Sequence, residues 1–114
     1  MIHTQSTRIN RVAQLIQRQL AQLIPREVRD PRLQSMVTVS GVEVARNLSF
    51  AKVFFTVFQG DPEQVSAILN AASGFLRGRL AKQLELRTMP ELRFVYDSTI
   101  VEANHLSRLI DEVN

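Results

Sequence analysis

The side chains that most often carry out acid–base or nucleophilic catalysis are scarce in this sequence. Cysteine is absent, and histidine occurs twice, as His3 near the start and His105 near the end of the chain. No serine lies in the strand–turn–helix context of a nucleophile elbow, and the acidic residues show no spacing typical of a metal site. Glu102 and His105 have the spacing of a helical surface pair. We therefore expect that the protein is not an enzyme and uses neither a metal nor a cofactor.

Arginine is the abundant functional side chain. Twelve of the fourteen cations are arginine, and five of these lie within residues 1–29, which contain a single acid, Glu27. Residues 94–114 show the reverse, with Arg108 against four acids. A guanidinium is planar, permanently charged and able to bind phosphate through two hydrogen bonds. This uneven distribution favours an oriented surface for a polyanion.

One expected arginine-bearing element is residues 71–87, a helix that breaks and resumes as a basic amphipathic helix. We place the break at Ala72, Ser73 and Gly74, because glycine costs about 1 kcal/mol in a helix interior and indicates a kink or a close backbone approach. Gly74 and Gly78 are spaced for close helix packing or a kink, and lack the pattern of a phosphate-binding loop. The basic face is either an ordinary solvated surface or a phosphate-binding one. Its cations are Arg77, Arg79, Lys82 and Arg87.

The other arginine-bearing element is residues 8–24, whose apolar side chains recur with helical period. Arg8, Arg11 and Arg18 lie on the opposite face, and Arg11 and Arg18 are about 20° apart around the axis. Pro25 disfavours helical geometry before it, so we expect the helix to end at Ile24. Here too a solvated face and a phosphate contact surface are both open interpretations.

Strand patterns occupy the middle of the chain. Residues 36–44 and 49–59 are rich in β-branched and aromatic side chains and are separated by a four-residue connection, which predicts an antiparallel hairpin. Residues 91–96 alternate like a third strand. In the second strand, alternation gives a fully apolar face of Ala51, Val53, Phe55 and Val57, expected to pack under helices. The other face is mixed, and its phenylalanines are either half-buried packing or a platform for bases. The mixed face comprises Phe50, Lys52, Phe54, Thr56 and Phe58.

The remaining signals complete one domain over residues 1–114, with residues 1–6 expected to be flexible. Asp61 and Pro62 mark a helix start, and Thr99 with Glu102 marks the start of a final helix. The predicted order is α-β-β-α-kink-α-β-α. No apolar run reaches the roughly 20 residues that span a bilayer, and the first residues lack a signal-peptide pattern. Together with the missing cysteine, this predicts a cytoplasmic protein that is not attached to a membrane.

Several motifs in order along the chain are similar to those of bacterial ribosome-binding factor A. They are residues 11–14, 26–33, 39–44, 48–53, 72–77, 90–97 and 101–102, within a match that spans roughly residues 8–113. The resemblance implies an α+β fold, a type II KH-like domain with a three-stranded sheet packed on helices and a C-terminal helix. Most KH domains clamp a nucleic-acid backbone with a Gly-x-x-Gly loop. The family has an alanine-centred kink instead, which Ala72, Ser73 and Gly74 match here.

The resemblance also implies a function. The family binds the immature small (30S) ribosomal subunit and its 16S rRNA, assists late maturation including 5′-end processing without catalysing cleavage, and is associated with growth in the cold. Ribosomal proteins or an assembly GTPase are further candidate partners, and we expect a monomer. One alternative is a protein-interaction module that uses the mixed strand face and the acidic last helix, and another is a generic KH-type RNA-binding domain. A small ribonuclease would need a base that the sequence does not offer. The candidate RNA-binding residues are Arg8, Arg11, Arg18, Arg77, Arg79, Lys82 and Arg87.

Overall fold

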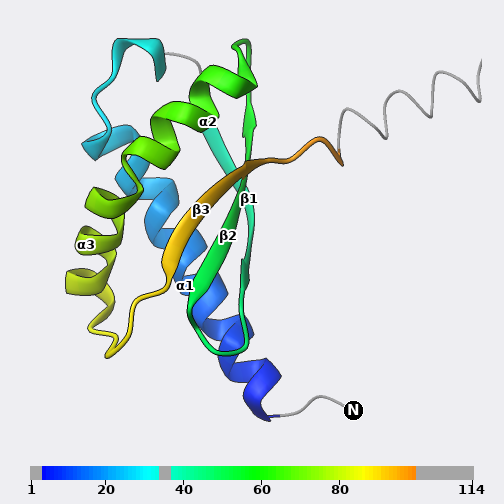
Figure 1. Ribbon diagram of the computed structural model, residues 1–114, viewed down its shortest axis with the longest axis vertical. Helices are drawn as coiled ribbons and strands as arrows, with labels where there is room; N and C mark the ends of the chain where they lie inside the picture. Colours follow the sequence, from blue (N-terminus) through cyan, green and yellow to red (C-terminus); the bar gives the residue numbers. More distant parts are fainter. Residues whose placement is uncertain (1–3, 34–36, 100–114) are drawn as a thin grey trace, which may run out of the picture.

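The computed structural model describes residues 4–33 and 37–99. Three helices cover one face of a three-stranded sheet (Figure 1). The elements run in the order α-β-β-α-kink-α-β that the sequence predicts, which confirms an α+β fold. The predicted final helix lies outside the described residues, as do His3, Glu102 and His105. The elements are α1 (Thr4–Glu27), the short 3₁₀ helix η1 (Pro31–Leu33), β1 (Val37–Val44), β2 (Phe50–Val57), α2 (Pro62–Ala71), α3 (Ser73–Leu84) and β3 (Glu91–Tyr96).

Helix α1 begins at Thr4 and continues through Pro25 to Glu27, so the prediction that it ends at Ile24 is wrong. Proline lacks the N–H that would donate to the carbonyl of Ala21. Ala21 is exposed, so water can serve that carbonyl. The helical hydrogen-bond pattern continues beyond the proline, because the N–H of Val28 donates to the carbonyl of Ile24 at 3.1 Å. The proline therefore removes one hydrogen bond without ending the helix.

Strand β2 is the centre of the sheet. It pairs with β1 as the predicted antiparallel hairpin and with β3 in parallel. A parallel neighbour requires a crossover connection, which α2 and α3 provide. In β1, Val39 pairs with Phe55 and Gly41 with Phe54, so Ser40 is the extra residue of a β-bulge. Strand β3 has the predicted bounds, while β1 and β2 are one to three residues shorter than predicted.

The crossover is a capped helix followed by a break. The Asp61 carboxylate accepts from the N–H of Glu63 at 3.0 Å, and Pro62 occupies the first helical position, as predicted. The break lies at Ala72, whose φ of −89° and ψ of 0° fall in the bridge region between helix and strand geometry. Its N–H still ends α2 by donating to Ile68, and its carbonyl starts α3 by accepting from Leu76. One residue therefore belongs to both helix ends.

The glycines of α3 do not have the role that the sequence indicated. Neither Gly74 nor Gly78 has a positive φ, and a Cβ built on either would meet nothing within 4 Å. Of the two interpretations left open, close backbone approach or helix packing is therefore wrong, and the kink lies at Ala72, two residues before Gly74. The backbone of Ala72 sets the break, and the two glycines lie on the exposed side of α3.

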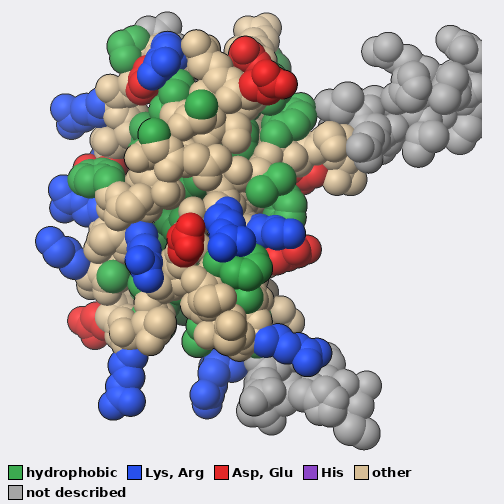
Figure 2. All heavy atoms as spheres, in the orientation of Figure 1, with side chains coloured by type: hydrophobic (Ala, Val, Ile, Leu, Met, Phe, Trp, Pro, Cys, Tyr) green, Lys and Arg blue, Asp and Glu red, His purple; other side chains and the backbone are tan. Residues whose placement is uncertain are grey.

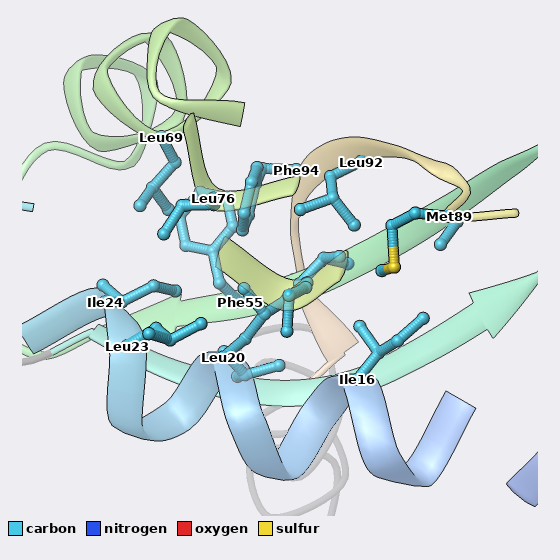
Figure 3. Close-up of a cluster of buried hydrophobic side chains, with 14 of the residues drawn as sticks. Ile16, Leu20, Leu23, Ile24, Phe55, Leu69, Leu76, Met89, Leu92 and Phe94 are labelled. Carbon is cyan, nitrogen blue, oxygen red and sulfur yellow. The ribbon is translucent and has the colours of Figure 1, made fainter. Parts of the chain in front are cut away.

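The core lies between the helices and the inner face of the sheet (Figure 3). Ala51, Val53 and Phe55 of β2 are fully buried, as their alternation predicts, and Val57 is half-buried. Fully burying a large apolar side chain stabilises the fold by about 1.5–3 kcal/mol, so this cluster holds α1, α2 and α3 against the sheet. Its other large members are Ile16, Leu20, Leu23, Ile24, Leu69, Leu76, Leu80, Met89, Leu92 and Phe94.

Candidate nucleic-acid interface

The predicted cations of α1 lie on its exposed face. Ile16, Leu20 and Leu23 turn the opposite face towards the core, which leaves Arg8, Arg11 and Arg18 exposed. Helix α1 packs on β1 and also contacts α3. The two arginine-bearing helices therefore adjoin each other in the layer that covers one side of the sheet.

Helix α3 presents its cations in the same way. Leu76 and Leu80 are fully buried, whereas Arg79 and Lys82 are exposed. The guanidinium of Arg79 lies 5.2 Å from the centre of the Phe75 ring, whose residue is 48% exposed. This cation–π contact orients the arginine without neutralising it. Figure 2 shows cationic side chains along the edge of the molecule where α3 lies.

Arg77 differs from the other predicted cations because its guanidinium is engaged within the protein. Its Nε and Nη2 donate to the carbonyl of Met89 at 3.0 and 2.7 Å. Met89 and Pro90 are buried immediately before β3 begins. Arg77 thus fastens the α3–β3 connection to α3, a role that its exposed position in a helical pattern did not reveal.

Arg87 follows α3 in the connection to β3. The helix ends with Glu85 in the left-handed region at φ 52°, and its N–H donates to the carbonyl of Ala81. This turn carries Leu86 and Arg87 towards the first half of α1. There the side chains of Arg8 and Arg87 line one cavity of about 500 Å³.

Arg46 lines the same cavity, although the sequence did not single it out. It lies in the exposed turn between β1 and β2, where Leu48 has a φ of 61°. Its neighbours in space are distant in the sequence, so its position follows only from how the hairpin packs beside α1. Arg11, Arg18, Arg79 and Lys82 do not line this cavity. Its other residues are Ile9, Val12, Leu48, Leu86 and Thr88.

The cations of α1 and α3 have no carboxylate partner among the described residues. The ion pairs among the described residues lie elsewhere: Arg32 pairs with Asp30 at 2.7 Å, and Arg93 pairs with Glu91 at 3.9 Å. The hydrogen bonds that Arg32 donates to Asp30, from its side chain and its backbone, lower the pKa of that carboxyl to about 2. Arg32 is therefore paired within its own turn, whereas the guanidiniums of Arg8, Arg11 and Arg18 form no ion pair within the described part of the chain.

The outer face of the sheet has a different character (Figure 2). Arg93 lies 4.2 Å from the centre of the Phe50 ring, so a cation already occupies one face of this ring, which was one candidate for stacking bases. Lys52 pairs in register with the acid Glu43 on one side and with the cation Arg93 on the other, so both signs of charge lie on this face. Phe58, 68% exposed, follows the end of β2. This face therefore carries both acidic and basic side chains.

The outer face also carries a side-chain link across β2. Ser40, the bulged residue of β1, donates through Oγ to Asp97 at 2.8 Å. Hydrogen bonds from the side chain and backbone of Thr99, together with that from Ser40, lower the pKa of the Asp97 carboxyl. The hydrogen bond connects β1 to the residue that follows β3, so it ties together the two edge strands of the sheet.

Within residues 4–33 and 37–99, no cluster of three or more His, Asp or Glu side chains could hold a metal ion. No helix in the described part of the chain is long and apolar enough to cross a membrane. The exposed arginines of α1 and α3 offer guanidinium groups that can bind anions.

Comparison with known proteins agrees with this geometry. The family model for ribosome-binding factor A matches residues 8–110. The chain belongs to the ribosome-binding factor A family. Ribosome-binding factor A of Legionella pneumophila (strain Lens) is 51% identical over 107 residues, which cover 94% of this chain and 87% of the relative.

Solved structures of ribosome-binding factor A share the fold. The crystal structure of the factor from Thermus thermophilus gives a TM-score of 0.70 at 27% identity, covering 77% of this chain and 94% of that one. A homology model of the Thermus thermophilus factor, fitted into a cryo-EM map of a 30S–RbfA complex, gives 0.68 at 27% identity and covers 79% and 96%. These neighbours have a KH-like fold, which confirms the predicted fold class. In this member of the family, Ala72 forms the break between the two central helices.

Proposed function

We propose that this protein binds the immature 30S subunit and that its helical side contacts the phosphates of 16S rRNA. The observation that carries the proposal is the set of exposed arginines on two adjoining helices, without carboxylate partners among the described residues. A Thermus thermophilus relative has been fitted into a map of a 30S–RbfA complex. The proposed contact residues are Arg8, Arg11, Arg18, Arg79, Lys82 and Arg87, with Arg77 in a supporting position.

Phosphate contacts would supply most of the affinity in this arrangement. Each neutralised phosphate releases counterions, so affinity falls with salt by about 0.7–0.9 logarithmic units per contact for each tenfold rise in salt. The specificity would come from the shape of a folded RNA junction, because an A-form helix is read mainly through its backbone and shallow groove. Arg77 should contribute less, since Met89 already takes two of its donors.

In the cell, the proposed role is that of an assembly factor. The protein would assist late 30S maturation, including 5′-end processing of the rRNA, while other nucleases perform the cleavage. The family assignment supports this role, and the scarcity of histidine and the absence of cysteine support a non-catalytic one. We further propose that it acts as a monomeric single domain in the cytoplasm and matters most for growth in the cold.

The test is binding to immature small subunits over a salt series. The variant combines Arg11→Ala, Arg18→Ala, Arg79→Ala and Lys82→Ala, and we expect a slope shallower by about three units and much weaker binding at low salt. Two double variants that remove the same charge are then compared. One is Arg11→Ala with Arg18→Ala on α1, and its matched control is Lys52→Ala with Arg93→Ala on the outer face of the sheet. Equal losses for the two double variants would contradict docking through the helical side.

A second candidate function rests on the exposed Phe58 beside the mixed-charge sheet face. This surface could bind a ribosomal protein or an assembly GTPase. Binding to purified protein components that survives nuclease treatment and is lost in Phe58→Ser would support it. If nuclease treatment abolishes all binding, the protein-binding candidate is wrong and the RNA interface remains the proposed function.

A further inference from the structure

The cavity between α1, the β1–β2 turn and the α3–β3 connection has two distinct kinds of wall. Three arginines line it, and four half-buried aliphatic side chains form the rest of its surface together with Thr88. No acidic residue of the described ranges lines it. The three segments meet at the lower end of the molecule in Figure 1, and Figure 2 shows cationic side chains projecting there. The arginines are Arg8, Arg46 and Arg87, and the aliphatic residues are Ile9, Val12, Leu48 and Leu86.

The electrostatics of the cavity favour a bound anion. Arg8, Arg46 and Arg87 bring three permanent positive charges to one hollow, and none of them forms an ion pair with a described carboxylate. Like charges that share a partly enclosed apolar site repel each other more strongly than they would in open water. An anion placed between them would relieve that repulsion and could accept two hydrogen bonds from each guanidinium.

The aliphatic wall favours a ligand that also has an apolar surface. Val12 and Leu86 also pack against the core, which fixes their positions, whereas Ile9 and Leu48 are not part of the core cluster. Leu48 is held in the left-handed region by a turn in which its N–H donates to the carbonyl of Ala45 at 2.8 Å. A leucine in that region is disfavoured by about 1–2 kcal/mol relative to glycine. The turn nevertheless places an apolar side chain at the cavity, where it offers a dry surface to a flat ring.

A nucleotide of single-stranded RNA combines the two properties. Its base is a flat ring with polar edges and two faces that can pack against apolar side chains, and the phosphates on either side carry one negative charge each. A volume of about 500 Å³ lies within the range of small-ligand sites. A base inside a duplex is stacked on both faces and cannot enter, so sequence-tolerant sites of this kind select unpaired nucleotides.

We propose that this cavity binds one unstacked nucleotide of single-stranded rRNA. The base lies against Ile9 and Leu48, and the flanking phosphates contact Arg8, Arg46 and Arg87. This inference rests on the proposed function and deepens it, because it makes the protein sensitive to an unpaired segment of the RNA. The site is separate from the break at Ala72, which lines a different hollow near η1.

The test uses the full chain, a labelled ten-nucleotide single-stranded RNA and the duplex of the same sequence. The variant Ile9→Ser with Leu48→Asn removes apolar surface without changing charge, and asparagine tolerates the left-handed region. We expect it to weaken single-strand binding about fivefold to tenfold while duplex binding stays unchanged. Arg46→Gln should weaken single-strand binding, and the matched control Lys52→Gln on the outer sheet face should not. Circular dichroism and thermal unfolding would confirm that each variant is folded.

The outcomes separate this inference from the proposed function. If the Ile9→Ser, Leu48→Asn variant binds single strands as well as the original protein, the nucleotide site is wrong. Equal affinity of the original protein for single strands and duplex, or for a mononucleotide and the ten-nucleotide strand, overturns it as well. The salt-dependent binding of small subunits through Arg11, Arg18, Arg79 and Lys82 could stand in each of these cases. Loss of that binding would refute the proposed function itself.

Discussion

Replacing Arg77 with alanine should lower the free energy of unfolding, because this arginine acts mainly within the protein and not at the proposed RNA-binding surface. Two guanidinium nitrogens donate to one carbonyl, that of Met89, at 3.0 and 2.7 Å. A hydrogen bond from a charged group contributes about 1.5–3 kcal/mol to stability. The two bonds share one acceptor and the arginine is otherwise exposed, so we expect a loss of about 1–2 kcal/mol in the free energy of unfolding.

Arg79→Ala is the matched control, because it removes the same charge two residues along the same helix. Arg79 contacts the exposed ring of Phe75 and donates to no carbonyl within the described part of the chain. Its loss should therefore change the free energy of unfolding by less than about 0.5 kcal/mol. Urea unfolding followed by circular dichroism measures both, and the thermal midpoint of Arg77→Ala should fall by roughly 5–10 °C. Equal urea midpoints for the two variants would refute the assignment of Arg77 as an anchor of the connection.

Three further predictions concern the backbone and the exposed ion pair. Gly74→Ala should stabilise the protein by about 1 kcal/mol in urea unfolding, because the added Cβ meets nothing within 4 Å; destabilisation would restore the close-approach interpretation. Pro25→Ala should raise stability by about 1–3 kcal/mol by giving Ala21 its missing helical donor, and protection of the amide at position 25 from hydrogen exchange would show that bond. The lowered pKa of Asp30 predicts that its pairing with Arg32 stabilises the fold above pH 4 and that this contribution is lost as the pH falls to about 2. Asp30→Asn should therefore be less stable than the original protein at neutral pH and equal to it near pH 2, and a constant difference across that range would be inconsistent with the pairing.

Local signals in the sequence predicted the elements well. Alternation beginning after Pro90 located β3 with its true bounds, and Asp61 with Pro62 located the start of α2. The inner face of β2 followed from the period of two. Pro25 misled the prediction because steric preference is a local rule, whereas Ile24 and Leu23 are buried and hold the helix in shape around the missing donor.

Features that depend on packing between distant segments could not be predicted. The parallel register of β2 with β3 depends on how α2 and α3 carry the chain across. The anchoring role of Arg77 depends on where the α3–β3 connection folds back. Arg46 joined Arg8 and Arg87 only because the β1–β2 turn lies beside the first half of α1. Of the candidate site, the sequence thus identified most of the cations but not their grouping.

The central claim is that the helical side of the molecule faces the RNA. The chain has no cysteine, so a single introduced thiol can carry a benzophenone crosslinker at a chosen position. Gln22→Cys on α1 and Gln83→Cys on α3 would place it on the exposed helical side, and Thr38→Cys on the outer face of the sheet. Bound to immature small subunits and irradiated, the two helical positions should crosslink to 16S rRNA and position 38 should not. Crosslinking to rRNA from position 38 alone would contradict the account.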